Sequence, residues 1–137
     1  MADSLIDAAA VFTFAVHEAL TGVASTQQLS VTQLRVLGIL RDRIPSMAEL
    51  ADHLRLDRSS VSGLIDRAEK RGLVVRGTAE HDARVVTVRL TDSGRALGAE
   101  LEAAVDRGVG ELLAAATVED REALVRIVQA IGRVGGP

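Results

Sequence analysis

The sequence predicts a mainly α-helical fold with one small β-hairpin, and two observations support this. Apolar residues recur at steps of three and four along most of the chain, as they do in amphipathic helices. Only the short runs 73–76 and 85–90 are rich in β-branched residues, which is typical of strands. Because two short helical patterns directly precede these runs, residues 46–90 indicate a winged helix-turn-helix.

The N-terminal part of the chain predicts two helices. The apolar stripe of the first is formed by Leu5, Ala9, Phe12, Val16, Leu20 and Val23. The polar segment 27–30 breaks this pattern, and Ser30 with Gln33 has the form of a capping box that starts a second helix. We expect that helix to run to about Arg43 and to be stopped by Pro45.

The two helices of the helix-turn-helix are outlined by their end signals. Ser46 and Glu49 form a second capping-box pattern, and Asp57 is a suitable N-cap for the following helix. Gly72 is placed to end that helix as a left-handed glycine. The polar segment Gly77–Arg84 lacks periodicity, so it predicts the loop of the hairpin.

The C-terminal part predicts two more helices and an association between copies of the chain. Thr91 starts a helical pattern that continues to about Ala116, and Thr117 with Asp120 starts the last helix. A small winged lobe cannot cover the apolar stripes of the terminal helices, which include Leu5, Phe12, Leu124, Val128 and Ile131. We therefore expect a homodimer built from these helices.

Composition limits the classes of function. The absence of cysteine excludes disulfides, thiolate metal sites and a thiol redox switch. The apolar run Ala8–Val16 is too short to span a bilayer and follows no basic leader segment, so we expect a cytoplasmic protein with no membrane partner. His17, His53 and His81 lie far apart in the sequence, which predicts neither a metal site nor a cofactor.

The net charge of −3 is unevenly distributed. Residues 30–95 hold 12 of the 16 Lys and Arg but only 9 of the 19 Asp and Glu. A mildly basic centre between acidic ends fits a middle segment that contacts phosphate. The alternative is a chance fluctuation in a surface of mixed charge.

The helix after Asp57 carries the candidate DNA-binding residues. Outside its apolar stripe it presents Arg58, Ser59, Ser60, Ser62, Gly63 and Arg67. Serine and glycine are poor helix formers, but short hydroxyls can bond phosphates or base edges where a helix end approaches DNA closely. The alternative is that these serines only cap a solvated helix.

The hairpin adds Arg76 and Arg84 to the candidate DNA-binding residues. Asp82 precedes Arg84 by two positions, so in a strand the carboxylate could orient the guanidinium for a narrow minor groove. The alternative is a surface ion pair of little energetic consequence.

Five motifs in register resemble the MarR family of multiple-antibiotic-resistance-type regulators. They are Leu50-Ala-Asp-His-Leu54, Asp57-Arg-Ser-Ser-Val-Ser62, Ala68-Glu-Lys-Arg-Gly-Leu-Val74, Asp82-Ala-Arg84 and Leu90-Thr-Asp-Ser-Gly94. The resemblance implies an obligate homodimer with interlocked first and last helices, placing two winged lobes on a pseudo-palindromic operator. It implies one domain over 1–137, with a DNA-binding lobe at about 30–95 and a helical dimerisation region at about 4–24 and 96–134.

Two positions depart from the family pattern. Gly63 and Ala83 stand where relatives usually carry basic residues, so DNA affinity should be modest or unusually sensitive to salt. The oxidation-sensing branch of the family needs a cysteine, which this chain lacks.

The resemblance also implies repression that is relieved by a small aromatic or anionic effector. We expect its site between the dimerisation helices and the winged lobe, near Phe14, His17 and Arg35. The alternatives are that His17 is simply solvated and that Arg35 pairs with Asp42 or Glu18.

The sequence thus predicts a sequence-specific DNA-binding transcriptional regulator, acting as a ligand-responsive repressor. It contains no phosphate-binding loop, nucleophile elbow or His–carboxylate pair of suggestive spacing, so we expect no enzyme. The alternative function is a winged-helix module that binds another protein without contacting DNA.

Overall fold

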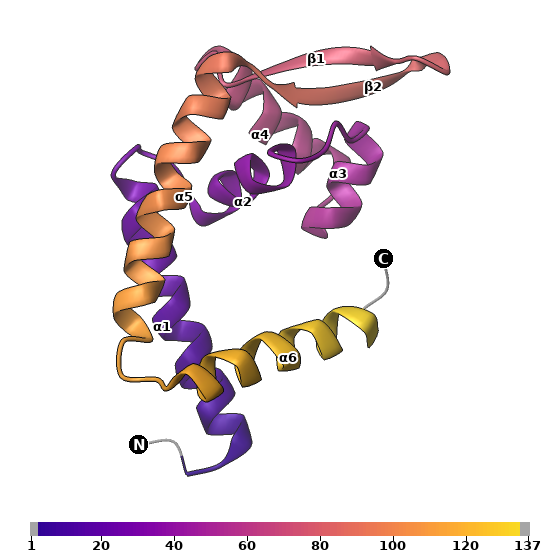
Figure 1. The fold of residues 1–137 in the computed structure, drawn as a ribbon. Coiled ribbons are helices and arrows are strands. Elements are labelled where there is room, and N and C mark those ends of the chain that lie inside the picture. The colour runs from indigo at the N-terminus through magenta and orange to yellow at the C-terminus, as the bar shows by residue number, and fades with distance from the viewer. Residues whose placement is uncertain (1–2, 135–137) are drawn as a thin grey trace.

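Six helices and one antiparallel hairpin make up the structure, a computed structural model that describes residues 3–134 (Figure 1). In chain order the elements are α1 (Leu5–Ser25), α2 (Val31–Leu40), α3 (Met47–Leu54), α4 (Arg58–Lys70), β1 (Val74–Ala79), β2 (Asp82–Leu90), α5 (Asp92–Leu112) and α6 (Val118–Val134). The predicted fold class, mainly α-helical with a β-hairpin wing, is confirmed.

The core lies in the lobe formed by α2, α3, α4 and the base of the hairpin. Its largest fully buried side chains include Leu40, Leu50, Ile65, Val74 and Val88. Helix α5 leaves this lobe and runs beside α1, and α6 turns off from the far end of α5 (Figure 1). The lobe therefore has its own core, whereas the terminal helices extend away from it.

The capping hydrogen bonds that the sequence predicts at the helix starts are mostly present. Ser30 Oγ accepts from the Gln33 amide at 3.1 Å, and Gln33 Oε1 accepts from the Ser30 amide at 2.7 Å. Thr117 and Asp120 form the same reciprocal pair. Ser46 Oγ caps α3, but the return bond from Glu49 is absent from the described structure.

The predicted hairpin loop Gly77–Arg84 is wrong, because most of it is strand. The ladder continues through the pair Thr78 with Val86 and ends at Ala79 with Asp82, so that only residues 80 and 81 turn. The outer part of a hairpin that projects into solvent buries neither face, so its residues need not alternate between apolar and polar. The pattern of apolar residues therefore could not reveal these strands.

Helix α2 ends at Leu40 rather than near Arg43. The chain that follows is extended, because the Pro45 carbonyl accepts from the Val88 amide at 3.0 Å and Ser46 bridges to Thr87. The segment at Pro45 and Ser46 thus pairs with β2 at the base of the wing. Because the chain must reach β2 there, α2 ends several residues before Pro45.

Helix α1 extends beyond the apolar run Ala8–Val16 at both ends. Whereas that run is too short to span a bilayer, the 21 residues of the helix are long and apolar enough to cross a membrane by length and composition alone. One such helix is weak evidence for a membrane span, and none of its most apolar window is buried within the described structure. Toward its C-terminal end, Val23 and the buried Ala24 belong to the core of the lobe.

The start of α5 packs directly against the backbone that follows α4. The Thr91 amide donates to the Leu73 carbonyl at 3.0 Å, and the Thr91 hydroxyl donates to the Gly72 carbonyl. Gly72 has the left-handed φ of 71° that was predicted for the end of α4. A Cβ on Gly94 would lie only 1.9 Å from the Leu73 carbonyl oxygen, so this position excludes every other residue without movement of the helix.

We therefore predict that Gly94→Ala lowers the free energy of unfolding by at least about 2 kcal/mol, because α5 must shift away from the lobe. Gly98→Ala, one turn along the same helix, is the matched control. Its Cβ would meet nothing within 4 Å, so helix propensity should make it neutral or stabilising by up to about 1 kcal/mol. Urea unfolding followed by circular dichroism measures both, and equal stability of the two variants would contradict the packing described.

Candidate nucleic-acid interface and neighbouring cavity

Helix α4 divides cleanly into a buried and an open face. Its core side is formed by Val61, Leu64, Ile65 and Ala68, all buried. The first turn and the opposite side carry the predicted DNA-contacting residues: Arg58, Ser59, Ser60 and Arg67 are exposed, and Ser62 and Gly63 are half-buried. The structure therefore places these six residues outside the core side of α4, with Arg58 to Gly63 toward its start and Arg67 in its last turn.

The N-terminus of α4 is organised by Asp57. Its Oδ1 accepts from the Ser60 amide at 2.7 Å and from the Ser59 hydroxyl at 2.8 Å. These bonds, the Ser60 amide first, lower the pKa of Asp57. The Ser59 hydroxyl is thus engaged within the protein.

An open hollow lies beside this helix end, and α2 contributes to it. Ser30 and Thr32, at the start of α2, line it together with Ser60, Gly63 and Arg67 of α4. Sequence reasoning missed Ser30 and Thr32 because nothing local indicates that the start of α2 lies beside α4. Both offer further hydroxyls on the same surface.

The two predicted wing arginines have different surroundings. Arg76 forms ion pairs with Asp66 at 2.9 Å and Glu69 at 2.8 Å, and these two carboxylates belong to α4. Its guanidinium therefore fastens the hairpin to α4 and is already neutralised.

Arg84 lies near the hairpin turn, and its side chain is 91% exposed. Its Nε lies 3.1 Å from Asp82 Oδ1, and its amide donates to the same oxygen at 3.0 Å. The side-chain bond from Arg84 lowers the pKa of Asp82. The predicted orientation of Arg84 by Asp82 is therefore present, although a pair this exposed adds little to stability.

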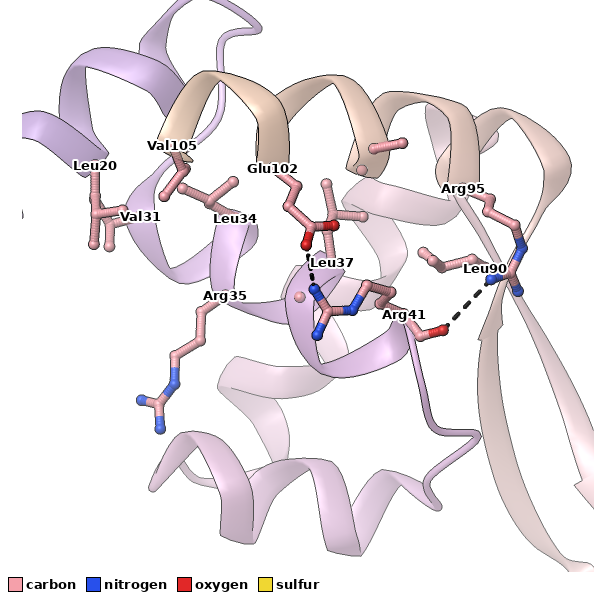
Figure 2. Close-up of a pocket in the computed structure, with 13 residues that line it drawn as sticks. Leu20, Val31, Leu34, Arg35, Leu37, Arg41, Leu90, Arg95, Glu102 and Val105 are labelled. Atoms are coloured by element: carbon pink, nitrogen blue, oxygen red, sulfur yellow. Dashed lines mark hydrogen bonds and ion pairs between the residues drawn. The ribbon is translucent and has the colours of Figure 1, made fainter. Parts of the chain in front are cut away.

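A separate cavity of about 380 Å³ lies between α1, α2 and α5 (Figure 2). Its lining is largely aliphatic, with Leu20, Val31, Leu34, Leu37, Leu90 and Val105. Arg41 at its edge forms ion pairs with Asp42 at 2.9 Å and Glu102 at 2.6 Å, and Asp42 is the main cause of the raised pKa of Arg41. Arg95 donates to the Arg41 carbonyl at 3.4 Å.

Of the three residues predicted to surround an effector, only Arg35 lines this cavity. Phe14 and His17 are exposed on α1 and do not line this cavity, because α1 meets it only farther along, at Leu20. Arg35 is among the lining residues, but its guanidinium points away from the apolar space toward α3 (Figure 2).

The partner of Arg35 also differs from the expected ones. Its Nη2 donates to the His53 carbonyl at 2.9 Å, so neither Asp42 nor Glu18 pairs with it. The charged residues that do border the cavity, Arg41, Arg95 and Glu102, were missed because α2 and α5 are distant in sequence. Within residues 3–134, no three His, Asp or Glu side chains are grouped so as to hold a metal ion.

Two short helices, α3 and α4, followed by a hairpin that ion pairs join to α4, make up a winged helix-turn-helix. The sequence model of the MarR family matches residues 27–85, from the end of α1 into β2. Over these residues, which are less than half of the chain, the sequence resembles the MarR family.

Solved structures match nearly the whole chain. The transcriptional regulator PA4135 superposes with a TM-score of 0.83 at 23% identity, covering 98% of both chains. CouR from Rhodococcus jostii, solved with p-coumaroyl-CoA, gives 0.82 at 25% identity, covering 94% of this chain and 92% of CouR. A variant of E. coli MarR in complex with operator DNA gives 0.74 at 22% identity, covering 90% of this chain and 91% of MarR.

The cap at Asp57 generates a prediction about pH. Because its pKa is lowered in the folded state, the cap stabilises the protein fully above the unfolded pKa near 3.8 and loses this contribution as pH falls through the folded value. Asp57→Ala should therefore lower the Tm clearly at about pH 7 and much less at about pH 2.5. Thermal unfolding of both proteins across this range provides the measurement, and a Tm difference independent of pH would show that the carboxylate charge is not involved.

Proposed function

We propose that this protein is a sequence-specific DNA-binding transcriptional regulator that acts as a homodimer on a pseudo-palindromic operator. The observation that carries the proposal is the open face of α4, which presents serine hydroxyls toward its start and an arginine near each end, beside a hairpin held to it by ion pairs. A helix of this kind fits the major groove, and its hairpin reaches the neighbouring backbone or minor groove. The solved MarR variant with operator DNA supports this use of the fold.

Within this proposal the contact residues have distinct roles. Ser60, Ser62 and Gly63 allow close approach to base edges, while Arg58 and Arg67 bind phosphate or guanine. Arg84 enters the minor groove near the hairpin turn. Arg76 acts indirectly, since its ion pairs with α4 hold the hairpin in position, and Ser59 supports the cap at Asp57.

The proposed dimer would cover apolar surface that one chain leaves open. None of the described side chains of α6 is buried, and Ile127, Val128 and Ile131 are each more than half exposed. Near the start of α1, Leu5 and Phe14 are exposed as well. A solitary helix without a packed face is unstable in water, so α6 requires a partner surface. A second copy offers the same unpaired helices, as a two-fold interface requires.

We further propose that the regulator is a repressor whose DNA affinity falls when a ligand occupies the cavity between α1, α2 and α5. The cavity lies where α5 joins the lobe to the dimerisation region. An occupant would therefore shift each lobe relative to that region, and this would change the distance between the α4 helices of the two subunits. Two solved structures of similar fold support a ligand-responsive role: that of BpsR from Bordetella bronchiseptica, whose DNA binding is regulated by 6-hydroxynicotinic acid, and that of CouR bound to p-coumaroyl-CoA.

The alternative function is a winged-helix module that binds a protein partner. The exposed hydroxyls and arginines of α4 favour DNA, because protein-binding surfaces are richer in aromatic and apolar residues at their centre. A mobility-shift assay with the DNA flanking the gene separates the two. Specific binding supports the regulator, and absence of binding at low salt supports the module.

Arg84→Ala should weaken binding to every duplex and reduce the slope of log affinity against log salt by about one, because one phosphate or minor-groove contact is lost. Arg107→Ala is the matched control. It removes an exposed arginine from the part of α5 that lies outside the DNA-binding lobe, so it should leave the slope unchanged. Fluorescence anisotropy at several salt concentrations measures both. Identical slopes for the two variants would remove Arg84 from the interface.

Val128→Glu should convert the dimer to monomer or partly unfolded chain, because it places a charge in the proposed apolar interface. Arg126→Glu, on the same helix, changes charge without replacing an apolar residue and should remain dimeric. Light scattering at micromolar concentration reports the mass. A folded wild-type monomer would refute the proposed assembly.

A further inference from the structure

A second hollow lies beside α2 and adjoins the aliphatic cavity. It has a volume of about 410 Å³ and is bounded by the end of α2, the loop that follows and α3. Its lining consists of Arg35, Gly38, Ile39, Arg41, Asp42, Arg43 and His53. We refer to it as the basic groove, because three of these seven side chains are guanidinium groups.

The basic groove and the aliphatic cavity share a wall. Arg35, Gly38 and Arg41 line both spaces. At the middle of this wall Gly38 has no side chain, and a Cβ there would meet nothing within 4 Å. Gly98 lines the cavity from α5 and is equally unobstructed. Glycine in the interior of a helix lowers helix stability by about 1 kcal/mol relative to alanine. At both positions the missing side chain leaves space beside the cavity.

The arginines of the basic groove retain charge for an anion. Arg43 Nη1 lies 3.0 Å from His53 Nε2, and Arg35 donates to the His53 carbonyl, so neither arginine is paired with a carboxylate. Only Arg41 is paired with carboxylates, those of Asp42 and Glu102. A planar guanidinium matches phosphate in a bidentate manner, and several in one groove favour a multiply charged anion.

We infer that the aliphatic cavity and the basic groove form one composite binding site for an amphiphile with an aliphatic tail and a phosphorylated head. The cavity has no aromatic lining residue, and its volume lies near the lower end of ligand pockets, so it fits a short hydrocarbon chain. The groove takes the head, and Gly38 lies between the two parts. This inference names the ligand class of the effector site proposed above, and it rests on that function only for its effect on DNA.

Arg41 connects the head to the rest of the fold. It reaches across from the end of α2 to Glu102 on α5 at 2.6 Å. A phosphate in the groove competes with Glu102 for this guanidinium, and it thereby weakens one of the links between the lobe and α5. Binding of the head would thus be coupled to the position of α5.

Isothermal titration calorimetry of the whole protein without DNA tests the composite site. The probes are octyl phosphate, with phosphate directly on the chain, and octanoyl-CoA, with phosphates farther from it. Octanoate, inorganic phosphate and free coenzyme A are the separate parts. At least one of the two amphiphiles should bind tenfold or more tightly than each of its parts, and the tighter one identifies the spacing of the head. The inference is overturned if each amphiphile binds no more tightly than one of its own parts. It is also overturned if neither amphiphile binds at all.

Two variants with matched controls locate the parts. Arg43→Gln should weaken the tighter amphiphile about tenfold and leave octanoate unchanged, whereas Arg107→Gln, on the part of α5 outside the DNA-binding lobe, should change neither. Gly98→Leu fills the cavity and should weaken the amphiphile and octanoate together, with Gly110→Leu on the same helix as control. Circular dichroism verifies the fold of each variant. Unchanged affinity in both Arg43→Gln and Gly98→Leu would place the ligand elsewhere.

Anisotropy with labelled operator then separates the site from the regulatory role. If the amphiphile binds and the variants respond as expected, but operator affinity does not change, the composite site stands and the ligand-responsive function fails. If the protein binds no DNA at all, calorimetry still decides the composite site by itself.

Discussion

The close contact between the start of α5 and the Leu73 carbonyl determines how the two halves of the molecule are joined. Gly94 permits the approach, and Thr91 fixes it through hydrogen bonds to the backbone at Gly72 and Leu73. The direction in which α5 leaves the lobe follows from this contact, because a helix cannot bend freely beyond its first turn. Both the cavity against α2 and the packing of α1 along α5 depend on that direction.

Features encoded by neighbouring residues could be predicted from the sequence. The caps at Ser30 and Asp57, the left-handed Gly72 and the bond between Asp82 and Arg84 each involve residues at most three apart or a single backbone conformation. The reach of the hairpin could not be predicted, because its outer strands face solvent on both sides and carry no apolar alternation. The terminal helices were recognised as helices, whereas their position relative to the lobe depends on tertiary contacts.

In the candidate sites, too, the features that depend on tertiary contacts could not be predicted. The arginines are indistinguishable in the sequence, but their surroundings differ in the structure. Arg76 is neutralised by two carboxylates of α4, Arg35 is bound to a backbone carbonyl, and Arg84 remains largely exposed. The ion pair of Arg41 with Glu102 joins residues 61 positions apart, and no local pattern indicates such a pair. The number of arginines in the middle segment therefore overstates how many guanidinium groups are available to a bound phosphate.

The continuity of α5 has a mechanical consequence. As a helix of 21 residues it is about 31 Å long, and it runs without interruption from the wing to the turn before α6. It can act as a stiff lever whose fulcrum is the backbone contact at Leu73. A tilt of about 5° at the fulcrum moves the far end by nearly 3 Å, on the order of half a helical turn. A displacement of a few tenths of an ångström beside the fulcrum is therefore amplified severalfold at the distal end.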